Sequence, residues 1–120
     1  MGTYVDGYVM PVPKDKVSEY RKLASDAGKV FREHGALEYV ECLAEDVKPG
    51  KLTSFPQSVQ LKEGETVIFS WIRFASRADR DRINEKVMND PKMKELFDPK
   101  HSPFDMQRMF FGGFEEFVRF

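Results

Sequence analysis

Residues 66–74 read Thr-Val-Ile-Phe-Ser-Trp-Ile-Arg-Phe, and this stretch decides the fold. Nearly every residue in it is β-branched or aromatic, which is typical of a strand that is buried on both faces. We therefore predict a strand at the centre of a β-sheet over residues 66–74, with the other elements arranged around it.

The half of the chain before this strand predicts a strand, a helix and a strand. Loose alternation over residues 3–12 predicts the first strand, which Pro11 and Pro13 end. Apolar residues then recur at spacings of three and four up to Gly35, which predicts an amphipathic helix. Alternation over residues 36–46 predicts a second strand. The helix face expected to pack on the sheet comprises Val17, Tyr20, Leu23, Ala24, Ala27, Val30, Phe31 and His34.

The second half repeats this order. Ser76 followed by Asp79 resembles a capping box and predicts the start of a second helix. A Phe-rich stretch over residues 107–120 predicts the last strand. The order βαββαβ predicts an α+β fold, a ferredoxin-like sandwich in which a four-stranded antiparallel sheet carries two helices on one face. The length fits a single domain spanning residues 1–120.

Such a sheet leaves one face without helices, and residues 107–120 carry aromatic side chains on both faces. A large exposed aromatic surface is rare in soluble monomers. We therefore expect a homodimer in which the bare sheet faces of two copies pack together, with Phe111 in the contact. The long connection over residues 47–64 is expected to act as a flap that closes a pocket between the sheet and the helices.

The composition excludes several classes of partner. Hydrophobic residues make up 41% and charged residues 32% of the 120 residues, as in ordinary folded proteins. The net charge is -1, from 19 Lys and Arg against 20 Asp and Glu, so we expect no nucleic-acid partner. The longest apolar runs are far below the roughly 20 residues of a membrane span. We expect no membrane segment and no export signal.

Cys42 is the only cysteine, so the chain forms no internal disulfide and no multi-thiolate metal site. A cytoplasmic protein is therefore expected. The acidic neighbours Glu41 and Glu45 disfavour a thiolate, and we interpret Cys42 as a small buried residue rather than a nucleophile. His34 and His101 lack the spacing of a metal site, and His101 is expected to be solvated, so we expect no metal and no cofactor.

Several stretches are specific enough to indicate a family. They are Tyr4-Val5-Asp6-Gly7-Tyr8, Arg32-Glu33-His34-Gly35-Ala36-Leu37, Asp46-Val47-Lys48-Pro49-Gly50-Lys51, Thr53-Ser54-Phe55-Pro56, Phe69-Ser70-Trp71-Ile72, Lys86-Val87-Met88-Asn89-Asp90-Pro91 and Phe104-Asp105-Met106-Gln107-Arg108-Met109 followed by Gly112-Gly113-Phe114. Together they resemble the YbaA-like bacterial proteins, the family of domain of unknown function 1428, over nearly the whole chain. The resemblance implies the dimeric α+β barrel superfamily, which also contains cofactor-free antibiotic-biosynthesis monooxygenases and haem-degrading enzymes. It brings no established catalytic residues.

Charged residues on the predicted strands give the main candidate site. Asp6, Glu41 and Asp46 lie within or at the end of strands, where a carboxylate requires a partner. Arg73 and Arg108, each on a predicted strand, are the expected partners. This set is either a salt-bridge network that holds a dimer together or a clamp for a ligand.

Two further residues are candidates for a pocket. His34 is either a general base or a histidine that favours the C-terminal end of the helix dipole. Trp71 either lines a pocket for a flat apolar ligand, together with Phe69, or packs in the core.

The sequence leaves three functions open. The first is a small-molecule binding or sensing module. The second is a cofactor-free monooxygenase or isomerase that uses His34, Trp71 and Arg73 around a dry cavity. The third is a structural dimer without a ligand.

Overall fold

The computed structural model describes residues 2–98, 100 and 102–120, so the prediction for His101 lies outside the described residues. The elements confirm the predicted βαββαβ order and also include a 3₁₀ turn and two short helices. In chain order they are β1 (Tyr4–Pro13), the 3₁₀ turn (Lys14–Lys16), α1 (Val17–Glu33), β2 (Glu38–Leu43), α2 (Phe55–Ser58), β3 (Glu65–Phe74), α3 (Arg77–Met88), α4 (Pro91–Leu96) and β4 (Phe110–Glu115).

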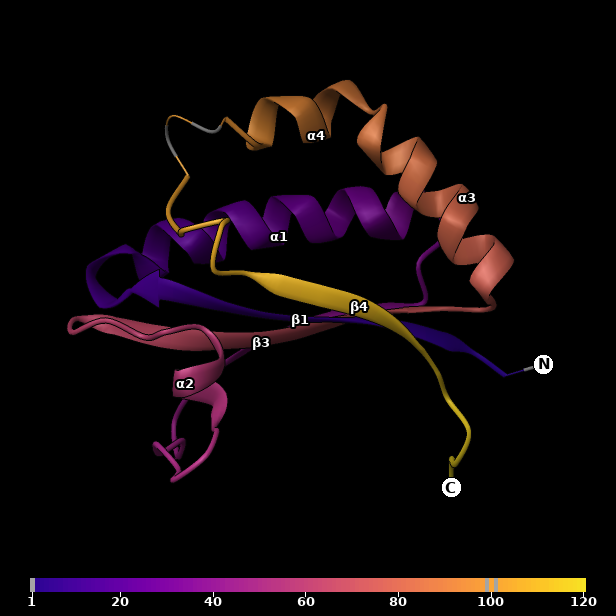
Figure 1. Ribbon diagram of the computed structural model, residues 1–120. Coiled ribbons are helices and arrows are strands. Elements are labelled where there is room, and N and C mark those ends of the chain that lie inside the picture. Colours follow the sequence, from indigo (N-terminus) through magenta and orange to yellow (C-terminus); the bar gives the residue numbers. More distant parts are fainter. Residues whose placement is uncertain (1, 99, 101) are drawn as a thin grey trace.

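The four strands form one antiparallel sheet in the order β2-β3-β1-β4. Helices α1, α3 and α4 lie over one face of this sheet, whereas α2 and the C-terminal residues lie on the other side (Figure 1). The α+β, ferredoxin-like sandwich is therefore confirmed. The strand predicted at the centre of the sheet, β3, is one of the two inner strands.

Side chains of the strands alternate between the two faces and place the core under the helices. On β1, Tyr4 and Met10 point to the helices and are buried, and Ile72 and Phe74 do the same on β3. The stripe of α1 packs onto this layer as the spacing predicted. Its buried members are Tyr20, Ala24, Ala27, Val30 and Phe31.

Local signals explain how the helices begin and end. Gly35 has a φ of +114°, a left-handed conformation that glycine adopts without strain, and it ends α1 as predicted. The Ser76 hydroxyl accepts a hydrogen bond from the Asp79 backbone N–H over 3.1 Å and caps α3. Strand β1 continues through Pro11 to Pro13, contrary to the prediction. Its pairing with β4 stops at Val9, so these prolines need no N–H bond on that side.

The face without long helices is apolar and partly exposed. Phe69 is 42%, Phe110 47% and Phe114 64% exposed, and all three point to this side of the sheet, which we call the open face. The prediction that Phe111 belongs to it is wrong. Phe111 pairs with Tyr8, whose side chain points to the helices, and the two rings stack at 5.5 Å.

The connection between β2 and β3 packs on the open face rather than over the helix side. Val59, which follows α2, is 1% exposed and clusters with Val9 of β1 and Val67 of β3. The predicted flap therefore covers one end of the open face and does not close a pocket between the sheet and the helices. Packing on Val9 and Val67 buries Val59, and the burial of apolar surface favours this placement of the connection.

Candidate functional site

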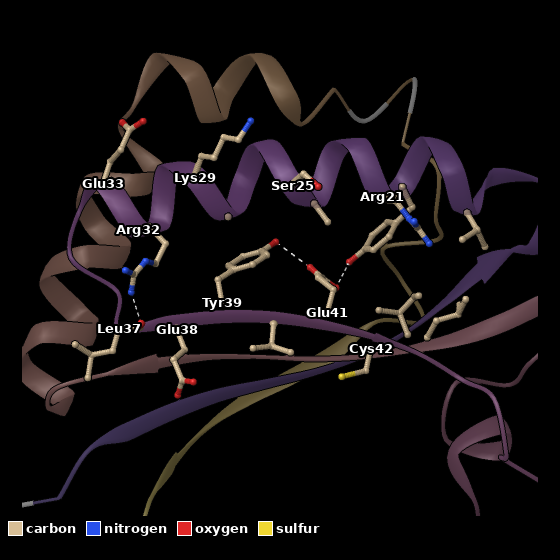
Figure 2. A pocket seen from close by; sticks show the side chains of 17 residues that line it. Arg21, Ser25, Lys29, Arg32, Glu33, Leu37, Glu38, Tyr39, Glu41 and Cys42 are labelled. Atoms are coloured by element: carbon tan, nitrogen blue, oxygen red, sulfur yellow. Dashed lines mark hydrogen bonds between the residues drawn. The ribbon is translucent and has the colours of Figure 1, made fainter.

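An open cleft of about 1160 Å³ lies between α1 and β2, the strand at the edge of the sheet (Figure 2). Small residues of α1 leave this space free on the helix side, namely Ala24, Ser25 and Gly28. The remaining walls are largely apolar or aromatic. They include Val17, Tyr20, Leu37, Tyr39, Val40, Leu43 and Ile68.

Glu41 lies in this cleft with its carboxylate directed toward the Tyr39 hydroxyl (Figure 2). The hydroxyl of Tyr20, on α1, donates a hydrogen bond to Glu41 Oε1 over 2.8 Å. The hydroxyl of Tyr39, on β2, donates to Glu41 Oε2 over 2.8 Å. The Ser70 hydroxyl, from the paired position on β3, also hydrogen-bonds the carboxylate. Hydroxyl groups from three elements therefore converge on one half-buried carboxylate.

Burial changes the protonation of these groups. Desolvation raises the pKa of Glu41 above its ordinary value, and the hydroxyl hydrogen bonds oppose this only in part. Burial, followed by the nearby Glu41 charge, also raises the pKa of Tyr20 and Tyr39, so both hydroxyls stay protonated at neutral pH. The set can hold a proton or accept a hydrogen bond from a bound molecule.

Gly28 fixes the position of the Tyr39 ring. A methyl group at Gly28 would lie 2.8 Å from Cδ1 of that ring, so only glycine lets the ring lie against the helix. The ring also packs against Phe31, with ring centroids 5.6 Å apart. These contacts hold the Tyr39 hydroxyl beside Glu41.

Charged side chains surround the mouth of the cleft. Arg32 donates to the backbone carbonyls of Ala36 and Leu37, which ties the end of α1 to the start of β2. Arg21 and Lys29 also line the cleft, and neither has an ion-pair partner among the described residues. The acidic residues at the mouth, in contrast, are paired elsewhere. Glu33 contacts Lys92 at 2.8 Å, and Glu38 contacts Arg73 at 3.5 Å.

Of the residues predicted for a site, only Glu41 lines this cleft. Asp6 is buried under α3, where Arg80 Nε donates to its Oδ1 over 3.0 Å and Asn84 donates to its Oδ2 over 3.4 Å. Arg80 also lies over the ring of Tyr4. Asp6 therefore belongs to a buried network between β1 and α3, away from Glu41.

The predicted pairing of these carboxylates with Arg73 and Arg108 is wrong. Arg73 points to the open face, where its Nε donates to Glu116 over 2.9 Å. Arg108 makes two hydrogen bonds to Glu65, of 2.8 and 2.7 Å, and one to Asp105. Sequence alternation shows which face a residue occupies but not which strand lies beside it, so the true partners were not visible.

Arg108 also donates to the backbone carbonyls of Val59 and Gln60. Its role is to anchor the end of the β2–β3 connection against the segment that precedes β4. Asp46 is exposed, just beyond β2, and makes no ion pair with any other described residue. Neither residue contributes to the cleft.

His34 and Trp71 lie on different sides of the sheet. His34 Nε2 contacts Asp90 Oδ2 at 2.8 Å, which joins the end of α1 to the N-cap residue of α4. This contact lowers the pKa of Asp90. Trp71 packs beside Phe69 on the open face, at 5.9 Å between ring centroids. Cys42 is half-buried on the same face.

The sequence interpretation missed three hydroxyl residues of the site, Tyr20, Tyr39 and Ser70. The two tyrosines were assigned to apolar faces of the helix and the strand. A signal was present, because a tyrosine on a buried face needs a hydrogen-bond partner, and Glu41 shares a strand face with Tyr39. Among the described residues, no three His, Cys, Asp or Glu side chains are grouped so as to hold a metal ion. Within the same residues, no helix has the length and apolar character needed to cross a bilayer.

Comparison with known proteins gives a family but no activity. The family model described as "Protein of unknown function (DUF1428)" matches residues 3–106. Curated relatives include the uncharacterized protein YbaA of Escherichia coli strain K12 and that of Shigella flexneri. Each is 49% identical over 115 residues, which cover 96% of this chain and 97% of the relative.

Among solved structures, the fold is similar to the crystal structure of a NIPSNAP family protein of unknown function from Agrobacterium tumefaciens. The TM-score is 0.59 at 13% identity, over 96% of this chain and 88% of that chain. At this identity the similarity concerns the fold alone, and it is consistent with a dimeric α+β barrel fold.

Proposed function

Since the chain belongs to the DUF1428 family of proteins of unknown function, we propose from its own geometry that it is a small-molecule binding or sensing module. The proposed binding site is the cleft between α1 and β2. The observation that supports this most is the convergence of the Tyr20, Tyr39 and Ser70 hydroxyls on Glu41 inside that cleft.

The shape and the chemistry of the cleft both favour a ligand. Small-molecule sites are typically concave spaces of about 300–1,000 Å³ with apolar walls and a few oriented polar groups. The cleft is of this order of size, and its polar set sits among Ala24, Leu37 and Ile68. The desolvation of a half-buried carboxylate opposes folding, and the hydroxyl hydrogen bonds to Glu41 offset it only in part, so a bound molecule that donates to Glu41 would be stabilised there.

An enzymatic function is the second candidate, and the raised pKa of Glu41 favours it. A carboxylate with a raised pKa is a better base near neutral pH. The residues expected for a cofactor-free monooxygenase or isomerase, His34, Trp71 and Arg73, do not line the cleft, so Glu41 would be the base. Oxygen uptake with electron-rich quinol substrates tests the oxygenase variant, and uptake no greater than that of buffer would exclude it.

We further propose that the protein is a cytoplasmic homodimer that buries its open face. The exposed rings of Phe69, Phe110 and Phe114 lie on that face, and Phe117, in the residues after β4, is 92% exposed. The nearby charges of Arg73 and Glu116 already neutralise each other. A second copy presents the same apolar surface, so a two-fold contact would bury the open faces of both copies in one interface. The single cysteine favours the cytoplasm.

The binding proposal is tested with a library of small fragments, followed by backbone NMR of the labelled protein. We expect a subset of fragments to shift the resonances of residues 20–28 and 38–43. In the variant Ser25→Trp, an indole should fill the mouth of the cleft and abolish these shifts. Lys22→Trp, on the solvent side of the same helix, is the matched control and should leave them unchanged. Absence of any shift in the cleft, or full binding by Ser25→Trp, would refute the proposal.

A further inference from the structure

We infer that the ligand of this cleft carries a protonated nitrogen on a small apolar body, and that Glu41 binds this cation. The inference rests on the proposed function and adds the chemical class of the ligand. It follows from the charge around Glu41, from its unused acceptor capacity and from the walls of the cleft.

Glu41 differs from every other non-exposed carboxylate of the described chain, because its partners are all neutral. Its hydrogen bonds come from the hydroxyls of Tyr20, Tyr39 and Ser70. Every other carboxylate that is buried or half-buried among the described residues contacts a basic side chain. These pairs are Asp6 with Arg80, Asp26 with Lys22, Glu65 with Arg108, Asp79 with Arg82, Asp90 with His34, Asp105 with Arg108 and Glu116 with Arg73.

The missing counter-charge has an energetic consequence. A carboxylate removed from water without a cation is stabilised by any positive charge that reaches it. Burial accordingly raises the pKa of Glu41, which means that the site favours a proton over the bare charge. An ammonium group provides the same positive charge together with an N–H donor.

The hydrogen-bond capacity of Glu41 leaves room for one such donor. An ionised carboxylate offers about four acceptor positions. The Tyr20 hydroxyl occupies one on Oε1 and the Tyr39 hydroxyl one on Oε2, and the Ser70 hydroxyl takes a third. The remaining position suits a single N–H directed from the cleft.

The walls of the cleft suit the rest of such a ligand. The hydroxyls of Tyr20 and Tyr39 both contact Glu41, and tyrosine rings attract cations that lie over their faces. Leu37, Leu43 and Ile68 supply apolar surface for the body of the ligand.

The charges at the mouth do not oppose a cation strongly. Arg21, Lys29 and Arg32 line the cleft together with Glu33 and Glu38, and these two glutamates are already paired with Lys92 and Arg73. Arg21 and Lys29 are exposed, so solvent and salt weaken their repulsion of a cation. Glu41 is therefore the charge that a desolvated ligand meets.

The test uses probes with one phenyl body and three head groups: phenethylamine, phenethyl alcohol and phenylpropionate. Affinity is measured by NMR titration of the cleft resonances at neutral pH and low salt. We expect the amine to bind about tenfold more tightly than the alcohol, equivalent to about 1.4 kcal/mol, and the carboxylate to bind most weakly. Glu41→Gln should remove the preference for the amine over the alcohol. Glu41→Asp, which keeps the charge, should retain part of the preference.

The outcomes separate this inference from the proposed function. If fragments bind in the cleft but the alcohol or the carboxylate equals the amine, the cation inference is wrong and the binding proposal stands. The same holds if Glu41→Gln binds the amine as the wild type does. If no molecule of any class binds in the cleft, both fail. Circular dichroism and thermal unfolding confirm that each variant is folded.

Discussion

The Tyr39 ring lies directly against the backbone of Gly28, at a distance that leaves no room for a side chain on the helix. In an unconstrained helix, replacing glycine with alanine stabilises the protein by up to about 1 kcal/mol. At Gly28 we expect the opposite sign. The added methyl group must displace the ring, so Gly28→Ala should lower the free energy of unfolding by about 1–3 kcal/mol. Urea denaturation measures this change.

Ser25→Ala is the matched control for that substitution, because Ser25 lies on the same side of α1 and is exposed. Its stability should stay within about 0.5 kcal/mol of the wild type. A Gly28→Ala protein that is as stable as the control would contradict the close packing of Tyr39 on the helix.

Replacing Glu41 with a residue that cannot accept a hydrogen bond should lower the free energy of unfolding substantially, whereas removing only its charge should lower it little. Glu41→Leu leaves the Tyr20 and Tyr39 hydroxyls without their partner, and we expect a loss of about 1–3 kcal/mol. Glu41→Gln keeps an acceptor oxygen and should cost less than about 1 kcal/mol at neutral pH. Equal losses in the two variants, by chemical denaturation, would contradict the hydrogen-bond assignment.

The pH dependence of stability follows from the raised pKa of Glu41. The folded protein holds this proton more tightly than the unfolded chain does. The resulting stability is therefore fully present below the ordinary value of 4.5 and is lost as pH rises through the raised pKa. The Glu41→Gln variant lacks this change. As the pH rises from 4.5 through the raised pKa of Glu41, the wild type should therefore lose stability relative to the Glu41→Gln variant.

Phe111 and Phe114 form a matched pair for testing the dimer, because both are 64% exposed but they point to opposite faces of β4. If the open face is the interface, Phe114→Asp should yield monomers or aggregates, since a charge there opposes burial. Phe111→Asp should leave the dimer intact. Light scattering coupled to size-exclusion chromatography measures the mass, and a monomeric wild type would contradict the proposal.

Breaking the Asp6–Arg80 ion pair should strongly lower the free energy of unfolding. Arg80→Met leaves the Asp6 carboxylate, which is 2% exposed, without its cation, and we expect a loss of about 3–5 kcal/mol. Arg82→Met removes an exposed pair with Asp79 on the same helix and should cost less than about 1 kcal/mol. Thermal unfolding of both variants checks the contrast.

Most of the fold was predictable from periodicity alone. The alternation in β1 and β2 predicts a strand in each case, and the apolar stripe of α1 predicts a helix together with its buried face. The exceptions have physical causes. Strand β1 extends over Pro13 because β4 does not pair there, and α2 depends on a Ser54 cap within a segment that otherwise indicates a loop.

The site was only partly predictable, because its chemistry depends on contacts between elements. Glu41 was selected from the sequence as a charged residue on a strand, and it does lie on β2. That Tyr20 would reach it from α1 depends on how the helix lies over the sheet, and that Ser70 would face it depends on the register of β2 with β3. Arg80 was overlooked as the partner of Asp6 because it lies on a helix far along the chain.

The strand order β2-β3-β1-β4 also determines how the molecule must fold. β1 is made first, yet both of its neighbours lie far downstream, and its first sheet hydrogen bonds await β3. Such non-local pairing slows the search for the native state. Refolding should therefore be slower than that of a helical bundle of equal length, and α1, whose hydrogen bonds are local, is able to form before the strands meet.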